Sequence, residues 1–485
     1  MTATVPPAAH PAHPAPAPHP RPMLRVLDPA DGSLVGELEV AGPGEVDAAV
    51  RAARSAAPGW ARTPAAERAA CLRTAADRVR AAVEELAVLT TREMGKPLAD
   101  ARGGVEAGLA TLAQYAELGP VHRGRSLTGA WQATDLMVHE PRGVVAVVTP
   151  WNDPVAVPAG LIGAALVTGN TVVFKPSERT PHTGLALARL LAGALPDGVL
   201  VTVTGDGSTG SALVGHPDLD MIAHVGSTAT GRSIAAAAAR TGAHVILENG
   251  GKDPLVVDAD VDPGWAAEQA ALGAFANAGQ ICTSVERIYV LADVAGPFLD
   301  ALTAAAAALR LGPGLDPATQ LGPLVDRRQR DVVHAHVTDA LDRGATLRAG
   351  GRVPEGPGAF YPATVLTGCR PDMLVMREET FGPVAPVTVV DTYDEALALA
   401  ADCAYGLAAT VLTADAGHAQ QAWRALPVGT VKINAVFGGA PGGAAQPRGA
   451  SGSGFGYGPE LLDEMTVTKV VHWRADPPRR PAARR

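Results

Sequence analysis

The chain has 485 residues, of which 47% are hydrophobic and 18% are charged, which describes a globular protein of about three domains and excludes a disordered or collagen-like chain. The net charge of −9 argues against a nucleic-acid partner, because no basic stripe is present to offset phosphate. Four cysteines at irregular positions form neither a disulfide framework nor a C-x-x-C metal site. We therefore expect a reducing, cytoplasmic location and no bound metal.

The N-terminal segment, residues 1–22, is rich in proline, histidine and alanine and lacks the basic and apolar regions of a signal peptide. We predict a disordered tail there. After it, Thr63 and Pro64 have the residue types of an N-cap and a first helical position, and apolar residues recur at three- and four-residue spacing from Ala65 to Thr91. This pattern predicts one long amphipathic helix over residues 65–91.

Short runs rich in β-branched residues alternate with helix-compatible stretches along the rest of the chain. The uncharged stretch 154–174 is long enough to span a bilayer, but proline and glycine interrupt it, so we expect a buried helix over Pro154–Val167 followed by a strand. The alternation predicts an α/β protein with mainly parallel sheets. The predicted strands are Val144–Thr149, Thr171–Phe174, Leu200–Thr204, Met221–Val225, His244–Leu247, Arg287–Leu291 and Ala385–Val390.

A first glycine-rich segment, Gly205 to Gly210, spells G-x-G-x-x-G after a predicted strand. The helix that should follow, over residues 211–214, would be stopped by Gly215 within about one turn. The segment is therefore a weak candidate for a dinucleotide site.

A second glycine-rich segment, Gly226 to Gly231, lies between a predicted strand and a helical pattern over residues 232–240. Ser227 or Thr228 would cap this helix and place a phosphate at its positive end. An ordinary strand-turn-helix cap is the alternative interpretation of either glycine-rich segment.

Lysine is rare in this chain, since only five of the 40 basic residues are lysine. We infer that lysine is kept where a planar guanidinium does not fit, and both Lys175 and Lys252 fall inside motifs. Lys175 follows a predicted strand, and the ends of strands are where α/β sheets bind ligands. Glu178 lies close by in the sequence, and its carboxylate can accept hydrogen bonds from two vicinal ribose hydroxyls. This pair predicts a nucleotide site.

Cys282 and Glu248 lie 34 residues apart and form the candidate catalytic pair. Cys282 stands among small and polar residues, whereas a structural cysteine usually has apolar neighbours, and the other three cysteines lack the setting of Cys282. A thiolate attacks a carbonyl carbon and leaves a thioester, and a separate carboxylate lets water hydrolyse that thioester. The alternative is that Cys282 is a small buried hydrophobic residue.

Six segments, in order along the chain, resemble the signature motifs of the NAD(P)-dependent aldehyde dehydrogenase superfamily. The resemblance covers about residues 24–473. It implies NAD-dependent oxidation of an aldehyde to the carboxylic acid through a cysteine thiohemiacetal, hydride transfer to NAD and hydrolysis of the thioester. The six segments are Thr149 to Asn152, Gly169 to Glu178, Gly226 to Thr228, Glu248 to Lys252, Gly279 to Cys282 and Glu379 to Pro383.

The resemblance also implies the domain organisation. A Rossmann-like NAD-binding domain would comprise residues 23–121 and 140–249, an α/β catalytic domain residues 250–444, and a small β oligomerisation arm residues 122–139 and 459–473. The subunit would assemble as a homodimer or homotetramer, with a small-molecule aldehyde as substrate and no membrane partner. The proline-rich, basic end, residues 474–485, is too short to pack and is predicted to be a disordered tail.

Carried over residue by residue, the resemblance implies Cys282 as nucleophile, Glu248 as the base that activates water, and Asn152 as a donor to the oxyanion. Lys175 and Glu178 would hold the adenosine ribose, and Glu379 with Phe381 the nicotinamide ribose. NAD is favoured over NADP, because a 2′-phosphate would meet the charge of Glu178. The full predicted cofactor-binding set is Thr149, Pro150, Trp151, Lys175, Ser177, Glu178, Gly207, Gly226, Ser227, Asn249, Gly250, Glu379 and Phe381.

The sequence departs from the family pattern at four places, so the aldehyde is not assigned by analogy. They are His224 with Val225, Asn249 beside the predicted base, Asp153 after Asn152, and residues 447–454, which lack the usual lysine. Asp153 precedes a proline and is either the N-cap of the next helix or a charge that favours a cationic aldehyde.

Two other functions remain open at this point. In a CoA-acylating aldehyde dehydrogenase, CoA rather than water takes the acyl group, and Glu248 argues against this because no water-activating base is then needed. A catalytically inactive structural or binding member of the fold is the second alternative. The presence of Cys282, Glu248 and Asn152 together argues against it.

Overall fold

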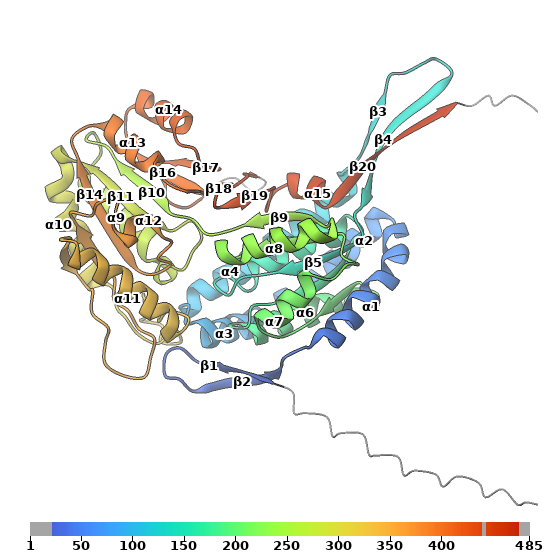
Figure 1. Cartoon of the computed structure of the whole chain (residues 1–485), viewed down its shortest axis with the longest axis horizontal. Coiled ribbons are helices and arrows are strands. Elements are labelled where there is room, and N and C mark those ends of the chain that lie inside the picture. The colour runs from blue at the N-terminus through green and yellow to red at the C-terminus, as the bar shows by residue number, and fades with distance from the viewer. Residues whose placement is uncertain (1–21, 439–442, 475–485) are drawn as a thin grey trace, which may run out of the picture.

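The computed structural model describes residues 22–438 and 443–474. Most of the two predicted tails, 1–22 and 474–485, therefore lies outside the described residues. Arg474, which the sequence analysis places in the second tail, is the last residue of strand β20 (Thr466–Arg474) and pairs with Ala133. Helices pack against a six-stranded and a seven-stranded sheet, both mainly parallel, so the predicted α/β class is confirmed (Figure 1).

The six-stranded sheet has the order β19-β9-β8-β5-β6-β7, and its strands are parallel except for β19, which runs antiparallel to β9. Its strands are almost entirely apolar because helices cover both faces. The five strands predicted for this region are confirmed to within two residues at each end. The bounds are β5 (Val144–Val148), β6 (Thr171–Lys175), β7 (Leu200–Thr202), β8 (Met221–Val225), β9 (His244–Glu248) and β19 (Gly452–Ser453).

Alternate residues of β5 enter two separate hydrophobic cores, because successive side chains of a strand point to opposite faces. Val145 and Val147 pack in one core with residues of α2 to α6 and α15, whereas Val144 and Ala146 pack in the other with residues of α1, α7 and α8. The bounds are α1 (Pro43–Arg62), α2 (Ala65–Ala81), α3 (Val83–Met94), α4 (Leu98–Leu118), η1 (Gly119–Val121), α5 (Ala156–Val167), α6 (Pro181–Ala192), α7 (Gly207–Val214), α8 (Thr228–Thr241) and α15 (Glu460–Glu464).

The prediction of one helix over residues 65–91 is wrong, because the chain breaks at Ala82 into α2 and α3. Alanine is the best helix former, so no local signal marks this break. The Ala82 N–H bonds to Val79 O, which closes the end of α2. Thr63 does not cap α2 either. It follows the last residue of α1, and its hydroxyl donates to Gly59 O.

Three other helices start at positions that differ from the prediction. Helix α7 begins at Gly207 instead of residue 211, because the Asp206 side chain accepts a hydrogen bond from Ser208 N. Helix α8 begins at Thr228, and the predicted cap by Ser227 is confirmed, since Ser227 Oγ accepts from Thr230 N at 3.3 Å. Helix α5 begins two residues later than predicted, at Ala156.

The seven-stranded sheet has the order β12-β13-β14-β11-β10-β16-β17, and only β12 is antiparallel to its neighbour. A single hydrophobic core joins this sheet to its helices. The strands are β10 (Asp253–Val257), β11 (Val285–Leu291), β12 (Thr346–Ala349), β13 (Thr364–Thr367), β14 (Val384–Val390), β16 (Ala408–Leu412) and β17 (Thr430–Ile433). The helices are α9 (Pro263–Phe275), η2 (Ala276–Gly279), α10 (Ala292–Ala308), α11 (Arg327–Asp342), α12 (Leu374–Arg377), α13 (Tyr393–Ala401) and α14 (Ala416–Ala425).

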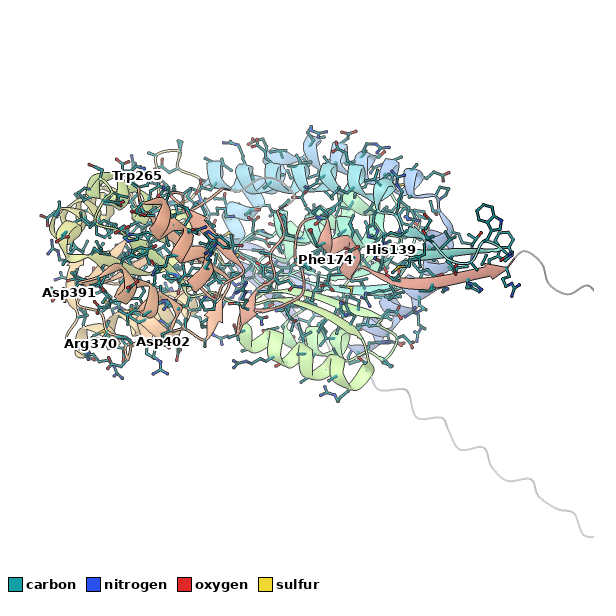
Figure 2. The ribbon with its side chains drawn as sticks, turned by 90° about the horizontal axis from the view of Figure 1, so that it is seen from above. His139, Phe174, Trp265, Arg370, Asp391 and Asp402 are labelled. Carbon is teal, nitrogen blue, oxygen red and sulfur yellow. The ribbon has the colours of Figure 1, made fainter. Side chains whose placement is uncertain are left out.

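A three-stranded antiparallel sheet forms an arm that projects from the six-stranded half of the molecule (Figure 1). It consists of β3 (Arg125–Leu127), β4 (Ala133–Pro141) and β20. In the view from above, His139 of β4 and Phe174 of β6 lie in the half that carries the arm, and Trp265 of α9 lies at the opposite end (Figure 2). Two further strand pairs are β1 (Met23–Leu27) with β2 (Leu34–Glu39) and β15 (Tyr405–Gly406) with β18 (Arg448–Gly449).

No helix within the described residues is both long enough and apolar enough to cross a bilayer. The stretch 154–174 forms α5 and β6 instead, as predicted.

Candidate active site

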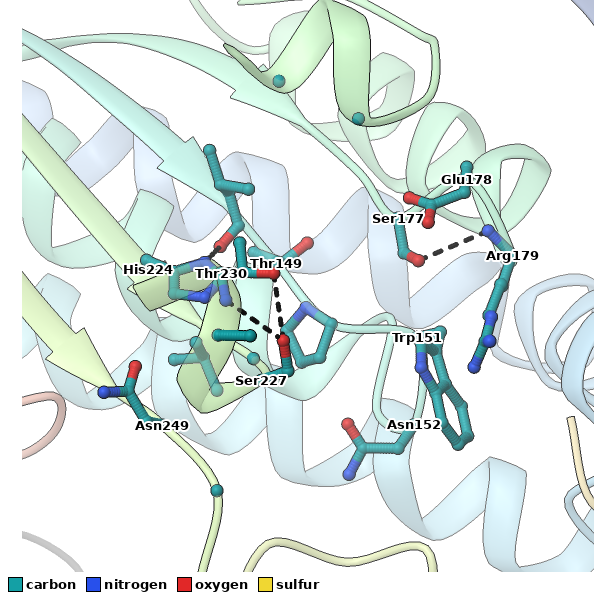
Figure 3. Close-up of a pocket in the computed structure, with 18 of the residues that line it drawn as sticks. Thr149, Trp151, Asn152, Ser177, Glu178, Arg179, His224, Ser227, Thr230 and Asn249 are labelled. Carbon is teal, nitrogen blue, oxygen red and sulfur yellow. Dashed lines mark hydrogen bonds between the residues drawn. The ribbon is translucent and has the colours of Figure 1, made fainter. Parts of the chain in front are cut away.

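A cavity of 680 Å³ opens at the carboxyl ends of strands β5, β6, β8 and β9, where parallel α/β sheets bind ligands. All thirteen predicted cofactor-binding residues line it, together with Asn152 and Cys282. Figure 3 shows Trp151, Asn152, Ser177, Glu178 and Ser227 around this cavity. Residues from distant parts of the sequence thus meet in one place.

The loop before Cys282 has an unusual backbone that fixes the position of the thiol. Asn277, Ala278 and Gly279 have φ angles of 49°, 55° and 70°, a left-handed conformation that costs free energy for residues other than glycine. A side chain at Gly279 would also lie 2.1 Å from Gly382 O. The fully buried Gln280 holds the loop, because its Oε1 accepts from Val325 N and its Nε2 donates to Asn277 O.

Cys282 and Glu248 lie near each other, because the segment that follows Glu248 packs against the loop of the cysteine, where a side chain at Gly251 would lie 2.6 Å from Cys282 O. Burial raises the pKa of Glu248, and the neighbouring Cys282 thiol lowers it in part. Burial raises the pKa of Cys282 well above its ordinary value, and the nearby charges of Glu248 and Asp253 raise it further. The thiol is therefore protonated at neutral pH, and the carboxylate next to it is placed to act as a base on a water molecule.

Asn152 lies next to this pair and is held by the same loop. Its Nδ2 donates to Gln280 O at 3.0 Å, and Asn277 Nδ2 donates to the same oxygen at 3.1 Å. An amide NH2 group has two N–H bonds, so Asn152 can donate the second one to another acceptor. Beside a nucleophilic sulfur, that geometry suits stabilisation of an oxyanion.

A buried carboxylate, Glu286, organises the loop that carries Glu379 and Phe381. Glu286 accepts from the backbone N–H groups of Thr380 and Phe381, both at 2.8 Å, and from Lys252 Nζ at 2.7 Å. Glu379 Oε1 accepts from Gly251 N at 3.0 Å, and burial raises the pKa of Glu379 to about 8. These bonds bring the loop of Glu379 against the segment that follows Glu248.

The predicted ribose-binding pair lies at the end of β6. Lys175 is buried, and its Nζ donates to Pro176 O and lies 3.7 Å from Glu178 Oε2. The Glu178 side chain is 45% exposed, so its carboxylate can reach a bound molecule. Burial lowers the pKa of Lys175, and the charge of Glu178 raises it.

The cavity has the features needed to hold a nicotinamide dinucleotide. The N-terminus of α8, capped by Ser227, offers backbone N–H groups to a phosphate. His224 lines the cavity and is 4% exposed, and its Nε2 is buried without a hydrogen-bond partner within the described residues. Burial lowers the pKa of His224 to about 4, so this ring is neutral. Donors, acceptors and size therefore fit the cofactor.

Three departures from the family pattern now have a structural description. The Asn249 side chain points away from Trp151 in Figure 3, and its Nδ2 donates to Ala450 O. Val155, not the predicted Asp153, is the N-cap of α5, but Asp153 Oδ1 accepts from Ala156 N, the first residue of that helix, at 3.3 Å. Segment 447–454, without its lysine, still reaches the site through Ser451, whose Oγ donates to Gly250 O.

Sequence reasoning missed several residues that support the site. Gln280 lies inside the predicted motif, but its role in holding the loop has no sequence signal. Glu286 and Gln329 lie outside every motif, and Gln329 Nε2 donates to the carbonyls of Thr380 and Phe381. Arg179 lies over the Trp151 ring at 5.3 Å from its centroid.

Comparison with known proteins places this geometry in a family. The sequence model of the aldehyde dehydrogenase family matches residues 17–471. The chain belongs to the aldehyde dehydrogenase family. It is 40% identical over 468 residues to a 3,6-anhydro-alpha-L-galactose dehydrogenase of Streptomyces coelicolor, covering 93% of each protein.

Two solved structures support the same conclusion. A 3,6-anhydro-L-galactose dehydrogenase in complex with NAP has a TM-score of 0.90 and 34% identity, covering 93% of this chain and 96% of that one. An NAD+ complex of an aldehyde dehydrogenase from Bacillus cereus has a TM-score of 0.91 and 34% identity, covering 94% of each chain. This protein is therefore an oxidoreductase that acts on aldehydes with a nicotinamide cofactor, and the predicted fold is confirmed.

We predict that Lys252→Met destabilises the protein by about 3–5 kcal/mol, because it leaves the buried carboxylate of Glu286 without its cation. The Lys252 side chain is fully buried. Urea unfolding followed by circular dichroism measures this effect. The matched control is Lys469→Met, whose ion pair with Glu140 is exposed and should contribute less than about 1 kcal/mol. Equal stability of the two variants would contradict the prediction.

Proposed function

We propose that this aldehyde dehydrogenase oxidises its substrate to the carboxylic acid with Cys282 as nucleophile, Glu248 as general base and Asn152 as oxyanion donor. The observation that carries the proposal is that Cys282 lines the cofactor cavity and lies close enough to Glu248 for the charge of that carboxylate to raise the pKa of the thiol. We also propose the domain boundaries predicted from the sequence, with residues 23–121 and 140–249 binding the cofactor.

The first step is attack on the aldehyde. The Cys282 thiol gives up its proton to solvent as the sulfur forms a bond to the aldehyde carbon, which gives the anion of a thiohemiacetal and leaves Glu248 ionised for the later step. The negative charge that develops on the former carbonyl oxygen meets the Asn152 amide and the Cys282 backbone N–H. Each such preorganised donor stabilises the transition state by about 3 kcal/mol.

The second half of the reaction releases the acid. When bound, the nicotinamide ring supplies the acceptor for a hydride, so that the thiohemiacetal becomes a thioester on Cys282. Glu248 then removes a proton from water, which attacks the thioester carbon and expels the Cys282 sulfur. Burial raises the pKa of Glu248 toward neutrality, which suits a group that accepts a proton at neutral pH.

The cofactor is held at both of its ribose groups in this proposal. Lys175 and Glu178 bind the adenosine ribose, and Glu379 binds the nicotinamide ribose next to Phe381. Trp151 and Phe381 contact each other edge to face, with centroids 5.3 Å apart, and both line the cavity. The charge of Glu178 favours NAD over NADP.

We further propose a cytoplasmic homodimer or homotetramer assembled through the arm. Several large apolar side chains are exposed on the arm, and a soluble monomer rarely exposes such a cluster to water. They include Leu127, Trp131, Val467, Val470 and Trp473.

Replacing either catalytic residue should have a distinct effect. Cys282→Ala abolishes aldehyde-dependent NADH formation but keeps NAD binding, because the residue makes only the covalent bond. Glu248→Gln lowers steady-state turnover by a factor of about 100 or more and accumulates the thioester. NADH absorbance with an aldehyde panel, with and without CoA, measures both. Full turnover of Glu248→Gln without CoA would show that Glu248 is not the base, and turnover that depends on CoA would favour the acylating alternative.

The cofactor preference should be measurable as a ratio of kcat/KM values. NAD is preferred over NADP by about fivefold to 150-fold, which corresponds to about 1–3 kcal/mol of repulsion between Glu178 and a 2′-phosphate. Glu178→Gln, which keeps the shape and removes the charge, should lower this ratio. Equal kcat/KM for the two cofactors in the unchanged enzyme would refute the assignment.

The arm should determine the oligomeric state. Val470 is 66% exposed, so Val470→Asp leaves the subunit folded but places a charge in the proposed interface. Light scattering after size exclusion should show a dimer or tetramer for the unchanged protein and a smaller species for the variant. Leu315→Asp, at a leucine outside the arm that is 44% exposed, is the control. A monomeric unchanged protein would rule out this proposal.

A further inference from the structure

Two polar side chains beside the catalytic pair have no role in the reaction described above. Asp153 follows Asn152 directly, and its side chain is 31% exposed. Tyr457 is 39% exposed and lies near enough to Asp153, Glu248 and Cys282 that their charges add to the effect of burial, which raises the tyrosine pKa. Gly456, the residue before Tyr457, lies directly against Glu248. A side chain at Gly456 would lie 2.9 Å from Glu248 Oε2.

The hydrogen bonds around the Tyr457 hydroxyl determine whether it can donate to a ligand or accept from one. Its hydroxyl lies 3.3 Å from Thr111 Oγ1. Thr111 has one O–H, and that O–H donates to Ala107 O at 2.9 Å, where only an acceptor is present. Tyr457 is therefore the donor to Thr111, and its oxygen keeps lone pairs to accept a hydrogen bond from a ligand.

Asp153 also offers acceptor positions. Its Oδ1 accepts from Ala156 N, and its Oδ2 lies 3.7 Å from the buried Lys96 Nζ. An ionised carboxylate has about four acceptor positions, so these contacts leave some of them available. Gly104 of α4 has no side chain that could crowd the Asp153 carboxylate. A Cβ atom at this position would lie 3.0 Å from Asp153 Oδ1.

We infer that Asp153 and Tyr457 form a pair of hydrogen-bond acceptors that recognises the hydroxyl groups of a hydroxylated aldehyde. This inference rests on the proposed function, since it assigns the substrate class of the same site. A substrate hydroxyl can donate to either oxygen, whereas an alkyl chain leaves both acceptors without a partner when it displaces water from them.

The same contacts argue against two other substrate classes. A cationic aldehyde would gain little from Asp153, because the charge of Lys96 already balances that carboxylate. A carboxylated aldehyde has no donor for either oxygen and would bring a second negative charge beside Glu248 and the acceptor oxygen of Tyr457. Asp153 therefore has both a capping role and a role in specificity.

The test compares three aldehydes of equal carbon number: glyceraldehyde, propanal and 3-aminopropanal. The unchanged enzyme with NAD should prefer glyceraldehyde to propanal by about tenfold or more in kcat/KM. Tyr457→Phe, which keeps the ring and removes the oxygen, should lower that ratio about threefold to tenfold, with the change in the KM for glyceraldehyde. Asp153→Asn, which keeps the cap and removes the charge, should lower it as well.

Tyr393→Phe is the matched control, because it removes a tyrosine hydroxyl that donates to His418 O far from the site. It should leave the ratio unchanged. An unchanged ratio in Tyr457→Phe, or a preference for 3-aminopropanal that is lost in Asp153→Asn, overturns the inference while the proposed function stands. Absence of NADH formation from every aldehyde would instead refute the proposed function, and the inference with it.

Discussion

The site depends on one buried ion pair, between Lys252 and Glu286. Lys252 lies four residues after Glu248, and Glu286 lies four residues after Cys282. The two strands that begin here, β10 and β11, are parallel neighbours, with Asp253 opposite Val285. The ion pair therefore sets the base segment and the nucleophile segment side by side. The 34-residue separation noted in the sequence is the length of a crossover through helix α9 between those two strands.

The electrostatics of the site follow from the carboxylates gathered around this ion pair. Glu248, Asp253 and Glu379 all act to raise the pKa of the Cys282 thiol. Burial raises the pKa values of these three carboxyl groups as well. Such an environment keeps the resting sulfur protonated, and in the proposed mechanism the proton leaves only as the bond to the aldehyde carbon forms. It also explains why the rare lysines of this chain, Lys252 and Lys432, lie near the catalytic pair.

The sequence was sufficient to predict the strands and the site motifs, because both are local patterns. Apolar runs such as Val144–Val148 fill strands buried on both faces, and most of the predicted cofactor residues lie just after such strands, whereas Glu379 and Phe381 lie before β14. The helix break at Ala82 was not predictable, since apolar spacing continues across it and alanine favours a helix. Packing of α3 against other elements fixes the break.

Support for the site was also invisible in the sequence. Gln280 and Glu286 hold backbone groups that are distant in the chain, and no spacing rule connects Glu286 to Phe381 or Gln280 to Val325. The sequence could predict that the thirteen proposed cofactor residues and Cys282 line one cavity, because most of them stand in contiguous motifs. Asp153, just before α5, pairs with Lys96, which stands more than 50 residues earlier in the chain. Because the sequence does not show this pairing, it could not separate a capping role of Asp153 from a role in binding a cationic substrate.

The central claim is that Cys282 carries the acyl group and Glu248 releases it. The most direct measurement is peptide mass mapping of the enzyme quenched with acid during its first turnover with NAD and an aldehyde. The account predicts one acyl group per subunit, on the peptide that contains Cys282, at a level that rises when Glu248 is replaced by Gln. An acyl group on the peptides of Cys71, Cys369 or Cys403, or none on Cys282 while NADH is formed, would contradict it.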